Sequence, residues 1–184
     1  MADDIPRLIE TRRFADERGW FEESYNVRRF AELGVETVFV QDNHVRNIAA
    51  FTLRGLHFQG PPRAQAKLIR CPAGALFDVA VDIRVGSPTF GRWEGVVLSS
   101  ENGRQLFIPA GFAHGFVVTG DEALVNYKCT EFYRPGQEYS VLWSDPDVGI
   151  PWPVESPTLS PKDAAAPRLA DIPPDRLPRY EAGG

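Results

Sequence analysis

The middle of the chain is a succession of short runs rich in β-branched and aromatic residues, and this pattern constrains the fold more than any other feature. Gly, Pro, Asp and Ser interrupt the runs, as at residues 72–74, 84–88 and 102–103. Runs at this spacing favour antiparallel strands in a sandwich or barrel, so the sequence predicts an all-β protein. The predicted strands are residues 37–43, 53–58, 66–71, 75–83, 93–98, 105–108, 114–119, 123–130 and 141–143.

Two other segments are predicted to be accessories of this β-fold. Residues 27–33 read as a short helix, with Asn26 as its N-cap and Gly34 as its C-cap. From Ser156 onward the chain is rich in Pro and Ala, and Pro cannot donate to a sheet ladder. We therefore expect the C-terminal part to wrap the barrel as coil or short helices.

The length and the charge of the chain limit its partners. A chain of 184 residues is long enough for one full core, and we take residues 1–184 as a single domain. The net charge of -5 gives no basic field for nucleic acid. The sequence has no long uncharged apolar run and no secretory-leader pattern, so we expect a cytoplasmic protein that binds no membrane. Cys71 and Cys129 are expected to be reduced, buried thiols.

Residues 53–59, Leu-Arg-Gly-Leu-His-Phe-Gln, place a histidine and an arginine in an otherwise apolar strand. Side chains alternate between the faces of a strand, so Arg54 and His57 reach one pocket only if Gly55 bends the strand. Burying such groups is costly unless they serve a site. Arg54 and Lys67 would crowd positive charge around His57, which favours the neutral imidazole and keeps it available as a base. This pattern predicts proton transfer on an anionic small molecule.

Residues 109–114, Pro-Ala-Gly-Phe-Ala-His, have the spacing found in the second half of the cupin signature, where a turn delivers a histidine into the barrel. A metal-binding cupin also needs His-x-His and a following Glu, whereas residues 57–59 offer His-Phe-Gln. Glutamine is a poor substitute for an imidazole ligand. The chain has three histidines, His44, His57 and His114. We therefore expect no metal site, and we place His114 at the pocket wall as a hydrogen-bonding residue.

Tyr127 and Asp163 are candidates to complete an acid–base site. If Tyr127 faces the same pocket as His57, a phenol and an imidazole stand on opposite sides of one bound ring, which suits removal of a proton from one face and its return to the other. Lys67 would then stabilise the enolate oxygen. Asp163 is a loop acid that by itself would be a solvated or capping residue. If it folds back and pairs with an imidazole, it would fix the tautomer of that ring, as the acid of a hydrolase triad does. Hydrolysis itself is not expected, because no nucleophile elbow surrounds Ser160.

Residues 16–23 read as a turn followed by an aromatic and acidic strand. One interpretation is an ordinary hairpin edge. The other is a nucleotide-binding strand, in which Arg18 holds a phosphate, Phe21 stacks on a base and Glu23 accepts a hydrogen bond from a base N–H. The chain lacks a glycine-rich phosphate loop, so arginines would have to hold any diphosphate.

With these residues in view, the chain resembles the dTDP-4-dehydrorhamnose 3,5-epimerases, the RmlC-like cupins, from about Phe14 to about Asp163. Several motifs occur in one order, which makes the resemblance highly specific. The matching motifs are Asp16-Glu17-Arg18-Gly19-Trp20-Phe21, Gln41-Asp42-Asn43-His44, Leu53-Arg54-Gly55-Leu56-His57-Phe58-Gln59, Gln65-Ala66-Lys67, Phe77-Asp78-Val79-Ala80-Val81-Asp82-Ile83-Arg84, Gly86-Ser87-Pro88-Thr89-Phe90-Gly91, Pro109-Ala110-Gly111-Phe112-Ala113-His114-Gly115-Phe116, Tyr127-Lys128-Cys129-Thr130 and Asp145-Pro146. One stretch, residues 45–52, is slightly longer and more apolar than the Ser-rich loop usual in the family, which bears on substrate preference.

The resemblance implies a cupin-type double-stranded β-helix, or jelly roll, that forms a homodimer and needs no metal or other cofactor. It implies epimerisation of dTDP-4-dehydro-6-deoxy-D-glucose at C3 and C5, giving dTDP-4-dehydro-L-rhamnose. In this reading His57 is the base for both carbons and Asp163 is its partner. Lys67 stabilises the enolate, and Tyr127 is the acid on the opposite face. The residues implied for substrate binding are Arg18, Phe21, Glu23, Gln41, Asn43, Arg54, His114, Tyr133 and Lys162, with some nucleotide contacts supplied by the partner subunit.

Three other functions remain open from the sequence. A single-site epimerase of the same scaffold would invert only C3 or only C5 of another dTDP-deoxysugar. A metal-dependent cupin enzyme is motivated by His57 and His114, and a non-catalytic sugar-nucleotide binder would show no turnover. Deuterium at one or both carbons, activity after exhaustive chelation, and the effect of His57→Ala on turnover distinguish these readings.

Overall fold

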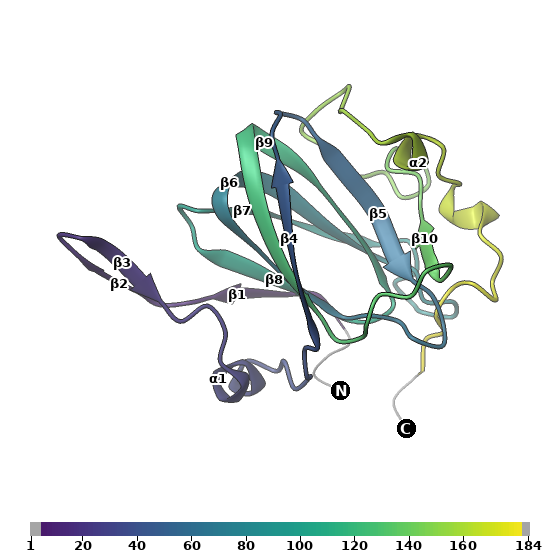
Figure 1. The fold of residues 1–184 in the computed structure, drawn as a ribbon. Coiled ribbons are helices and arrows are strands. Elements are labelled where there is room, and N and C mark those ends of the chain that lie inside the picture. The colour runs from purple at the N-terminus through teal and green to yellow at the C-terminus, as the bar shows by residue number, and fades with distance from the viewer. Residues whose placement is uncertain (1–4, 182–184) are drawn as a thin grey trace.

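Strands dominate residues 5–181, the part of the chain that the computed structural model describes. They are β1 (Arg7–Glu10), β2 (Arg13–Asp16), β3 (Gly19–Glu22), β4 (Gln41–Asn47), β5 (Leu53–Gln59), β6 (Lys67–Asp82), β7 (Trp93–Ser99), β8 (Arg104–Ile108), β9 (Phe112–Cys129) and β10 (Glu138–Ser140). Three short helices accompany them: α1 (Val27–Glu32), α2 (Pro161–Ala164) and the 3-10 helix η1 (Leu169–Asp171). The predicted all-β class is confirmed (Figure 1). Within residues 5–181, no helix has the length and apolar character needed to cross a membrane.

Two long strands, β6 and β9, form the centre of the fold. They pair antiparallel along two stretches, residues 67–70 against 126–129 and residues 76–82 against 112–118. Strands β8, β1 and β4 extend the sheet from the first stretch, and β7, β5 and β10 extend it from the second. The sheet thereby doubles back into two layers that face each other, which is the predicted jelly roll.

The prediction of separate strands at residues 66–71 and 75–83 is wrong in one respect, because β6 continues through the expected turn. The register against β9 shifts there, and the strand bends instead of ending. Gly74 permits the bend, since it has a φ of 78° and a Cβ at this position would lie 2.0 Å from the carbonyl oxygen of Glu122. The corresponding part of β9 was likewise predicted as two strands. Residue types that usually end a strand lie here at the point where the strand passes from one layer into the other.

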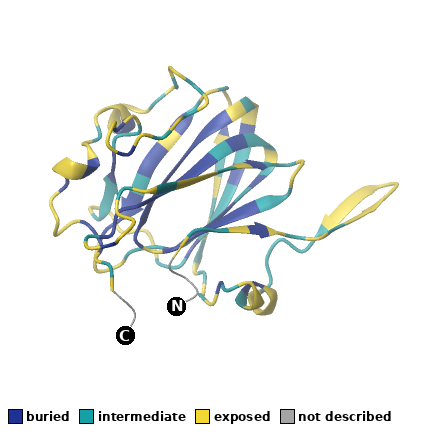
Figure 2. Ribbon diagram, turned by 180° about the vertical axis from the view of Figure 1, so that it is seen from behind, coloured by how far each residue is buried: buried dark blue, intermediate teal, exposed yellow. Residues whose placement is uncertain are grey.

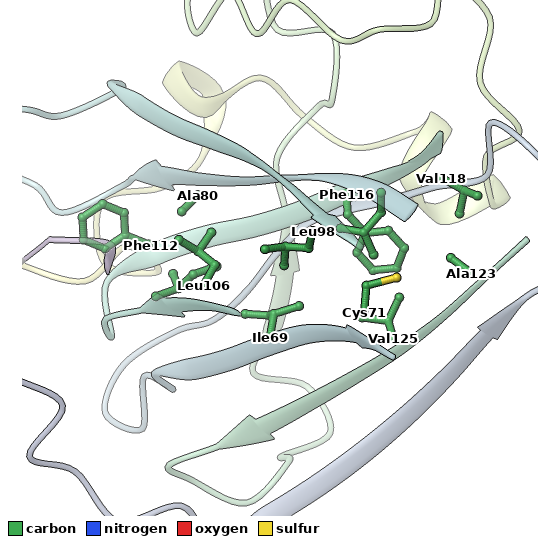
Figure 3. Packing of buried hydrophobic residues seen from close by; sticks show 12 residues of the cluster. Ile69, Cys71, Ala80, Leu98, Leu106, Phe112, Phe116, Val118, Ala123 and Val125 are labelled. Carbon is green, nitrogen blue, oxygen red and sulfur yellow. The ribbon is translucent and has the colours of Figure 1, made fainter. Parts of the chain in front are cut away.

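The space between the two layers is filled by apolar side chains from facing strands. Ile69, Leu98, Leu106, Phe116 and Val125 come from β6, β7, β8 and β9 and are each at most 4% exposed. Figure 3 shows these side chains pointing toward one another in one continuous cluster. Full burial of a side chain of this size contributes about 1.5–3 kcal/mol, so this cluster is a principal source of stability.

The C-terminal segment covers the outer face of the second layer, as predicted. Leu169 and Leu177 are buried against a cluster that includes Leu56 of β5. The carboxylate of Asp145 is itself buried and accepts a hydrogen bond from the backbone N–H of Leu169 at 2.7 Å. These contacts fix the path of the chain before and after η1, and they hold α2 beside β5 (Figure 1).

Helix α1 covers the other layer through buried Phe30, which packs with Leu68 and Phe107. The side chain of Asn26 accepts hydrogen bonds from the first backbone N–H groups, so the predicted N-cap is confirmed. The C-cap is Leu33, one residue earlier than predicted, and Gly34 follows it with a φ of 80°.

Other strand assignments also differ from the prediction, and β2 was not predicted. Strand β1 was not predicted, and it pairs with β8 along its whole length. Strand β4 starts four residues later than expected, at Gln41, because its partner stretch of β9 ends at Cys129. Strand β10 comes just before the predicted residues 141–143. Val141 still exchanges backbone hydrogen bonds with Leu56, at 2.9 and 3.3 Å.

Strands β2 and β3 form a hairpin that projects from the body of the molecule (Figure 1). Its base is fixed by Arg13, whose guanidinium donates to the carbonyl oxygens of Ser100 and Glu101 at 2.7 and 2.9 Å. Phe14 and Phe21 face each other across the hairpin and are 47% and 68% exposed. Figure 2 shows the hairpin as an almost entirely exposed element, an unusual place for paired aromatic rings.

Candidate active site

A break in strand pairing brings two basic side chains to one cavity. The register between β5 and β9 shifts between Arg54 and His57, and Gly55 there has a φ of 113°. A Cβ on Gly55 would lie 2.6 Å from the Cα of Gly115 in β9. Because the strand is bent at this point, Arg54 and His57 both line a cavity of about 250 Å³, the arrangement for which the sequence required a bend.

Alanine at Gly55 is expected to destabilise the protein by about 3 kcal/mol, because it combines an unfavourable φ with a collision between two backbones. Gly86 is a matched control, since it has a φ of 87° but open space where a Cβ would lie. Gly86→Ala is expected to cost only about 1 kcal/mol, the conformational part alone. Urea unfolding of both variants measures the difference, and equal losses would show that the approach to Gly115 carries no energetic weight.

His57 is paired with a carboxylate from a distant part of the chain. Its Nε2 lies 2.5 Å from Oδ1 of Asp163, which is 2% exposed. The carboxylate also accepts from the backbone N–H of Gly55, which the bend turns toward it. Burial alone would raise the pKa of Asp163, but the hydrogen bond and charge of His57, together with bonds from Ser160 and Gly55, hold it below its usual value. Asp163 is therefore ionised at neutral pH and can stabilise an imidazolium.

The start of α2 fixes the position of Asp163. Ser160 is the N-cap, and its Oγ accepts a hydrogen bond from the backbone N–H of Asp163 at 3.1 Å. Pro161 occupies the first helical position, where its ring presets the backbone. Sequence reasoning considered Ser160 only as a nucleophile. The Ser-x-x-Asp spacing was the signal for its actual place, because it is typical of a capping box.

A second imidazole–carboxylate pair lies deeper in the barrel. His114 faces His57 across the β5–β9 pair, and its Nε2 lies 2.7 Å from Oδ1 of fully buried Asp78. Within residues 5–181, the other carboxylate oxygen of Asp78 has no hydrogen-bond partner. Burial lowers the pKa of His114, with Asp78 opposing this and the charges of Lys67 and His57 adding to it. His114 is therefore held neutral, and it can donate or accept a hydrogen bond at the pocket wall.

Lys67 begins β6 beside these groups. Burial lowers the pKa of its ammonium group, while the charges of Cys129, Glu138 and Asp78 act in the opposite direction. Its side chain is half-buried, and in the protonated form the ammonium group would attract a developing negative charge.

Tyr127 lies on β9 opposite Ile69 of β6 and packs against the inner core. Burial raises the pKa of its phenol, the charges of Cys129 and Glu138 raise it further, and Arg54 opposes them. The hydroxyl group is therefore protonated at neutral pH, as a proton donor must be. Tyr127 lines a second cavity, together with Asn43 and His44 of β4, and not the cavity that Arg54 and His57 line.

The amide side chains of β4 make two separate sets of contacts. Gln41 donates to Asn43 at 3.0 Å and accepts from the backbone N–H of Tyr133 at 3.0 Å. Asn47, which sequence reasoning missed, accepts from Nε of Arg54 at 2.8 Å. This bond orients the guanidinium, and within residues 5–181 its other N–H groups make no hydrogen bond.

Other predicted binding residues lie elsewhere. Arg18 and Phe21 are on the projecting hairpin, far from β5 (Figure 1). Arg18 is paired with Asp16 at 2.6 Å, and Glu23 with Arg29 at 3.3 Å. Within one chain the structure therefore does not bring the three predicted nucleotide contacts to the His57 cavity.

Several groups near the cavity were given no role from the sequence. Asp78 had a readable signal, because it is a carboxylate inside the apolar run at residues 77–83. Glu138, which pairs with Lys162 of α2, had none. Among residues 5–181, no three His, Cys, Asp or Glu side chains gather closely enough to hold a metal ion. The neighbouring strands β5, β9 and β6 carry a carboxylate-paired imidazole, a protonated phenol and a half-buried lysine. These are the kinds of group required to move a proton beside a carbonyl.

Comparison with known proteins relates this arrangement to a family. The family model described as dTDP-4-dehydrorhamnose 3,5-epimerase matches residues 5–171. The dTDP-4-dehydrorhamnose 3,5-epimerase of Salmonella typhimurium is 56% identical over 164 residues, which cover 88% of this chain and 89% of that protein.

Solved structures share the fold. The dTDP-6-deoxy-D-glucose-3,5-epimerase of Legionella pneumophila, in complex with dTDP-4-keto-L-rhamnose, has a TM-score of 0.92 at 51% identity, covering 96% of this chain and 94% of that one. A 3'-monoepimerase from Streptomyces bikiniensis, in complex with dTDP-quinovose, has a TM-score of 0.87 at 36% identity, with coverages of 98% and 92%. By family model, sequence identity and fold, this chain belongs to the dTDP-4-dehydrorhamnose 3,5-epimerase family.

Proposed function

We propose that the protein is an isomerase that epimerises dTDP-4-dehydro-6-deoxy-D-glucose at C3 and C5, giving dTDP-4-dehydro-L-rhamnose. The observation that carries this proposal is the His57–Asp163 pair, at 2.5 Å, on a cavity that Arg54 also lines. Relatives that are 50% identical or more and are named for this reaction support the choice of substrate.

The proposed chemistry uses the acidity of carbons beside a ketone. Both C3 and C5 neighbour the C4 carbonyl, so when His57 removes a proton, the C–H electron pair forms a C=C bond and the carbonyl electrons move to oxygen. Lys67 stabilises the enolate oxygen, and Asp163 stabilises the imidazolium. Tyr127 then returns a proton to the opposite face of the carbon, the carbonyl re-forms, and the configuration is inverted.

The same cavity is proposed to hold the substrate. Arg54 has the geometry to hold the diphosphate, and Lys162 lies on the same wall. The amide and hydrogen-bonding groups proposed to contact the sugar and the diphosphate are Gln41, Asn43, His114 and Tyr133. No metal or other cofactor takes part in this proposal.

The nucleotide contacts are proposed to come from a partner subunit in a homodimer. Phe14 and Phe21 are exposed on a hairpin far from the cavity of their own chain, and Arg18 lies at its tip (Figure 2). A second copy would bury these rings and place Arg18 near the base or phosphates.

Mixed dimers test this sharing. A hairpin variant, Arg18→Ala with Phe21→Ala, and a His57→Asn variant are each expected to be inactive alone. After co-refolding, mixed dimers contain one intact site, so about a quarter of the wild-type activity is expected to return. An inactive mixture would argue that each chain builds its site alone.

The function is tested by NMR of dTDP-4-dehydro-6-deoxy-D-glucose incubated with the protein in heavy water. Deuterium entering both C3 and C5 is the expected result. Label at one carbon would favour the second candidate, a single-site epimerase, which the likeness to the Streptomyces bikiniensis 3'-monoepimerase motivates. No label at either carbon would contradict both.

A further inference from the structure

The second cavity, which Tyr127 borders, has a polar wall on the outer face of the sheet. Its volume is about 130 Å³, and Leu68 and Arg70 of β6 line it. The residue between them, Ile69, belongs to the inner core. Because side chains alternate along a strand, Leu68 and Arg70 point to the other face, where Leu68 packs with Phe30 of α1. The sheet therefore separates this wall from the space between the two layers.

Arg70 gives this wall a positive charge that is not neutralised. Within residues 5–181, its half-buried guanidinium makes no hydrogen bond and no ion pair. Lys128 and Asp42 also line the cavity, but they neutralise each other, since Nζ of Lys128 lies 2.8 Å from Oδ1 of Asp42. A guanidinium that is partly withdrawn from water is stabilised by an oxyanion, which can accept two parallel N–H bonds from it. The cavity thus favours an anionic ligand.

Gln105 of β8 adds a hydrogen-bond acceptor to the same wall. It lies opposite Arg70 in the β6–β8 pair, so the two side chains share the outer face. Gln105 is 1% exposed, and its Nε2 donates to the carbonyl oxygen of Ser24 at 2.7 Å, which fixes the orientation of the amide. Among the described residues, no group donates to its Oε1. An acceptor on so enclosed a side chain favours a ligand that donates a hydrogen bond to it.

A second amide group lies on the other side of Arg70. Asn126 of β9 is opposite Arg70 in the β6–β9 pair and lines the cavity as well. In the part of the chain that the structure describes, its buried Oδ1 has no hydrogen-bond partner. The wall therefore combines one unpaired cation with amide oxygens that lack donors, and a ligand that suits it must be an anion that also carries an O–H group.

We propose that this cavity is a binding site for inorganic phosphate, separate from the His57 cavity. Arg70 holds an anionic oxygen of the ion, and Oε1 of Gln105 accepts a hydrogen bond from its O–H group. At neutral pH inorganic phosphate is charged and keeps at least one O–H group. Sulfate is charged but has none, and a phosphate monoester, whose second pKa is about 6, has lost its last one. The two side chains thus select hydrogen phosphate among oxyanions of similar charge.

Calorimetric titration of phosphate into the wild-type protein and into Arg70→Gln tests the position of the site. The variant is expected to bind phosphate about ten-fold more weakly, because a charge-assisted pair of hydrogen bonds is lost. Arg46→Gln is the matched control, since it removes the same charge from an arginine of β4 that pairs with Glu122 and is 72% exposed. Its affinity for phosphate is expected to stay within about two-fold of the wild-type value at constant ionic strength.

Two outcomes of these titrations would overturn the site. Equal losses in Arg70→Gln and Arg46→Gln would show that phosphate responds only to the net charge of the protein. Binding that survives Arg70→Gln but is lost in Arg54→Gln would place the ion in the His57 cavity.

Sulfate and methyl phosphate test the selectivity, and with it the role of Gln105. Both are expected to bind the wild-type protein about ten-fold more weakly than inorganic phosphate at neutral pH, because neither offers an O–H group to Oε1. If sulfate binds as tightly as phosphate, Gln105 accepts nothing from the ligand and the proposal fails. If methyl phosphate binds as tightly, the ligand is a phosphate ester and the assignment to inorganic phosphate is wrong.

NMR of the nitrogen-15-labelled wild-type protein locates the ion without any variant. Addition of phosphate is expected to shift the Nε–H signal of Arg70 and the side-chain amide signals of Gln105 and Asn126, while the imidazole signals of His57 stay in place. Shifts at His57 with unchanged signals at Arg70 and Gln105 would refute the site, even if Arg70→Gln did not fold.

Discussion

Replacement of His57 by Asn is expected to lower kcat by about 1000-fold, while KM changes by less than about three-fold. The asparagine amide can still hydrogen-bond to Asp163, so the fold of the cavity is retained, but it cannot accept a proton at neutral pH. The base acts mainly in the transition state, which is why binding is spared. Steady-state kinetics and titration with dTDP measure the two effects.

His44→Asn is the matched control for this prediction. His44 is exposed on β4 and has no part in the proposed mechanism, so kcat is expected to stay within about two-fold of the wild-type value. A large loss of binding with turnover retained in His57→Asn would show that the imidazole holds the substrate and is not the base.

Tyr127→Phe is expected to slow net epimerisation by about 100-fold, and to slow deuterium exchange at the first carbon much less. The ring remains to fill its place against the inner core, but the proton for the opposite face is lost. Exchange needs only the removal and return of a proton by His57 on one face. Its rate is therefore reduced less than the rate of inversion. Parallel NMR measurements of product and of label give both rates.

Tyr180→Phe serves as the control, because Tyr180 lies over the guanidinium of Arg84 in the C-terminal segment and its ring is kept. No change in either rate is expected there. If Tyr127→Phe reduces exchange and inversion equally, the phenol supports the base, and the proton that completes inversion comes from elsewhere.

The sequence predicted the strands well because alternation of apolar residues is a local property. It divided β6 and β9 wrongly because Pro72 and Gly74 in β6, and Gly120 in β9, are residue types that usually end strands. Only the closure of two layers shows that the chain continues through them. It missed β1 because four residues carry too little pattern to be separated from the hairpin that follows. Local signals thus identified most strands and helices. The residues at which each of them begins and ends depended on partners far along the chain.

Some features of the candidate site could be predicted from the sequence, and others could not. The bend at Gly55 could be argued from strand geometry alone, since two side chains three residues apart cannot otherwise share a pocket. The pairing of His57 with Asp163 spans 106 residues, and no spacing rule reaches that far, so it came from family resemblance. Glu138 could not be found at all, because an acid in a short polar strand has no distinguishing pattern.

The separation of His57 from Asp163 along the chain has a consequence for protein synthesis. While the ribosome is still making the chain, a barrel complete through β9 already holds the imidazole and the lysine, but the carboxylate is contributed only when residue 163 emerges. A nascent chain can therefore fold its core before its base is paired. The pairing of His57 therefore depends on a segment that is made after the core strands.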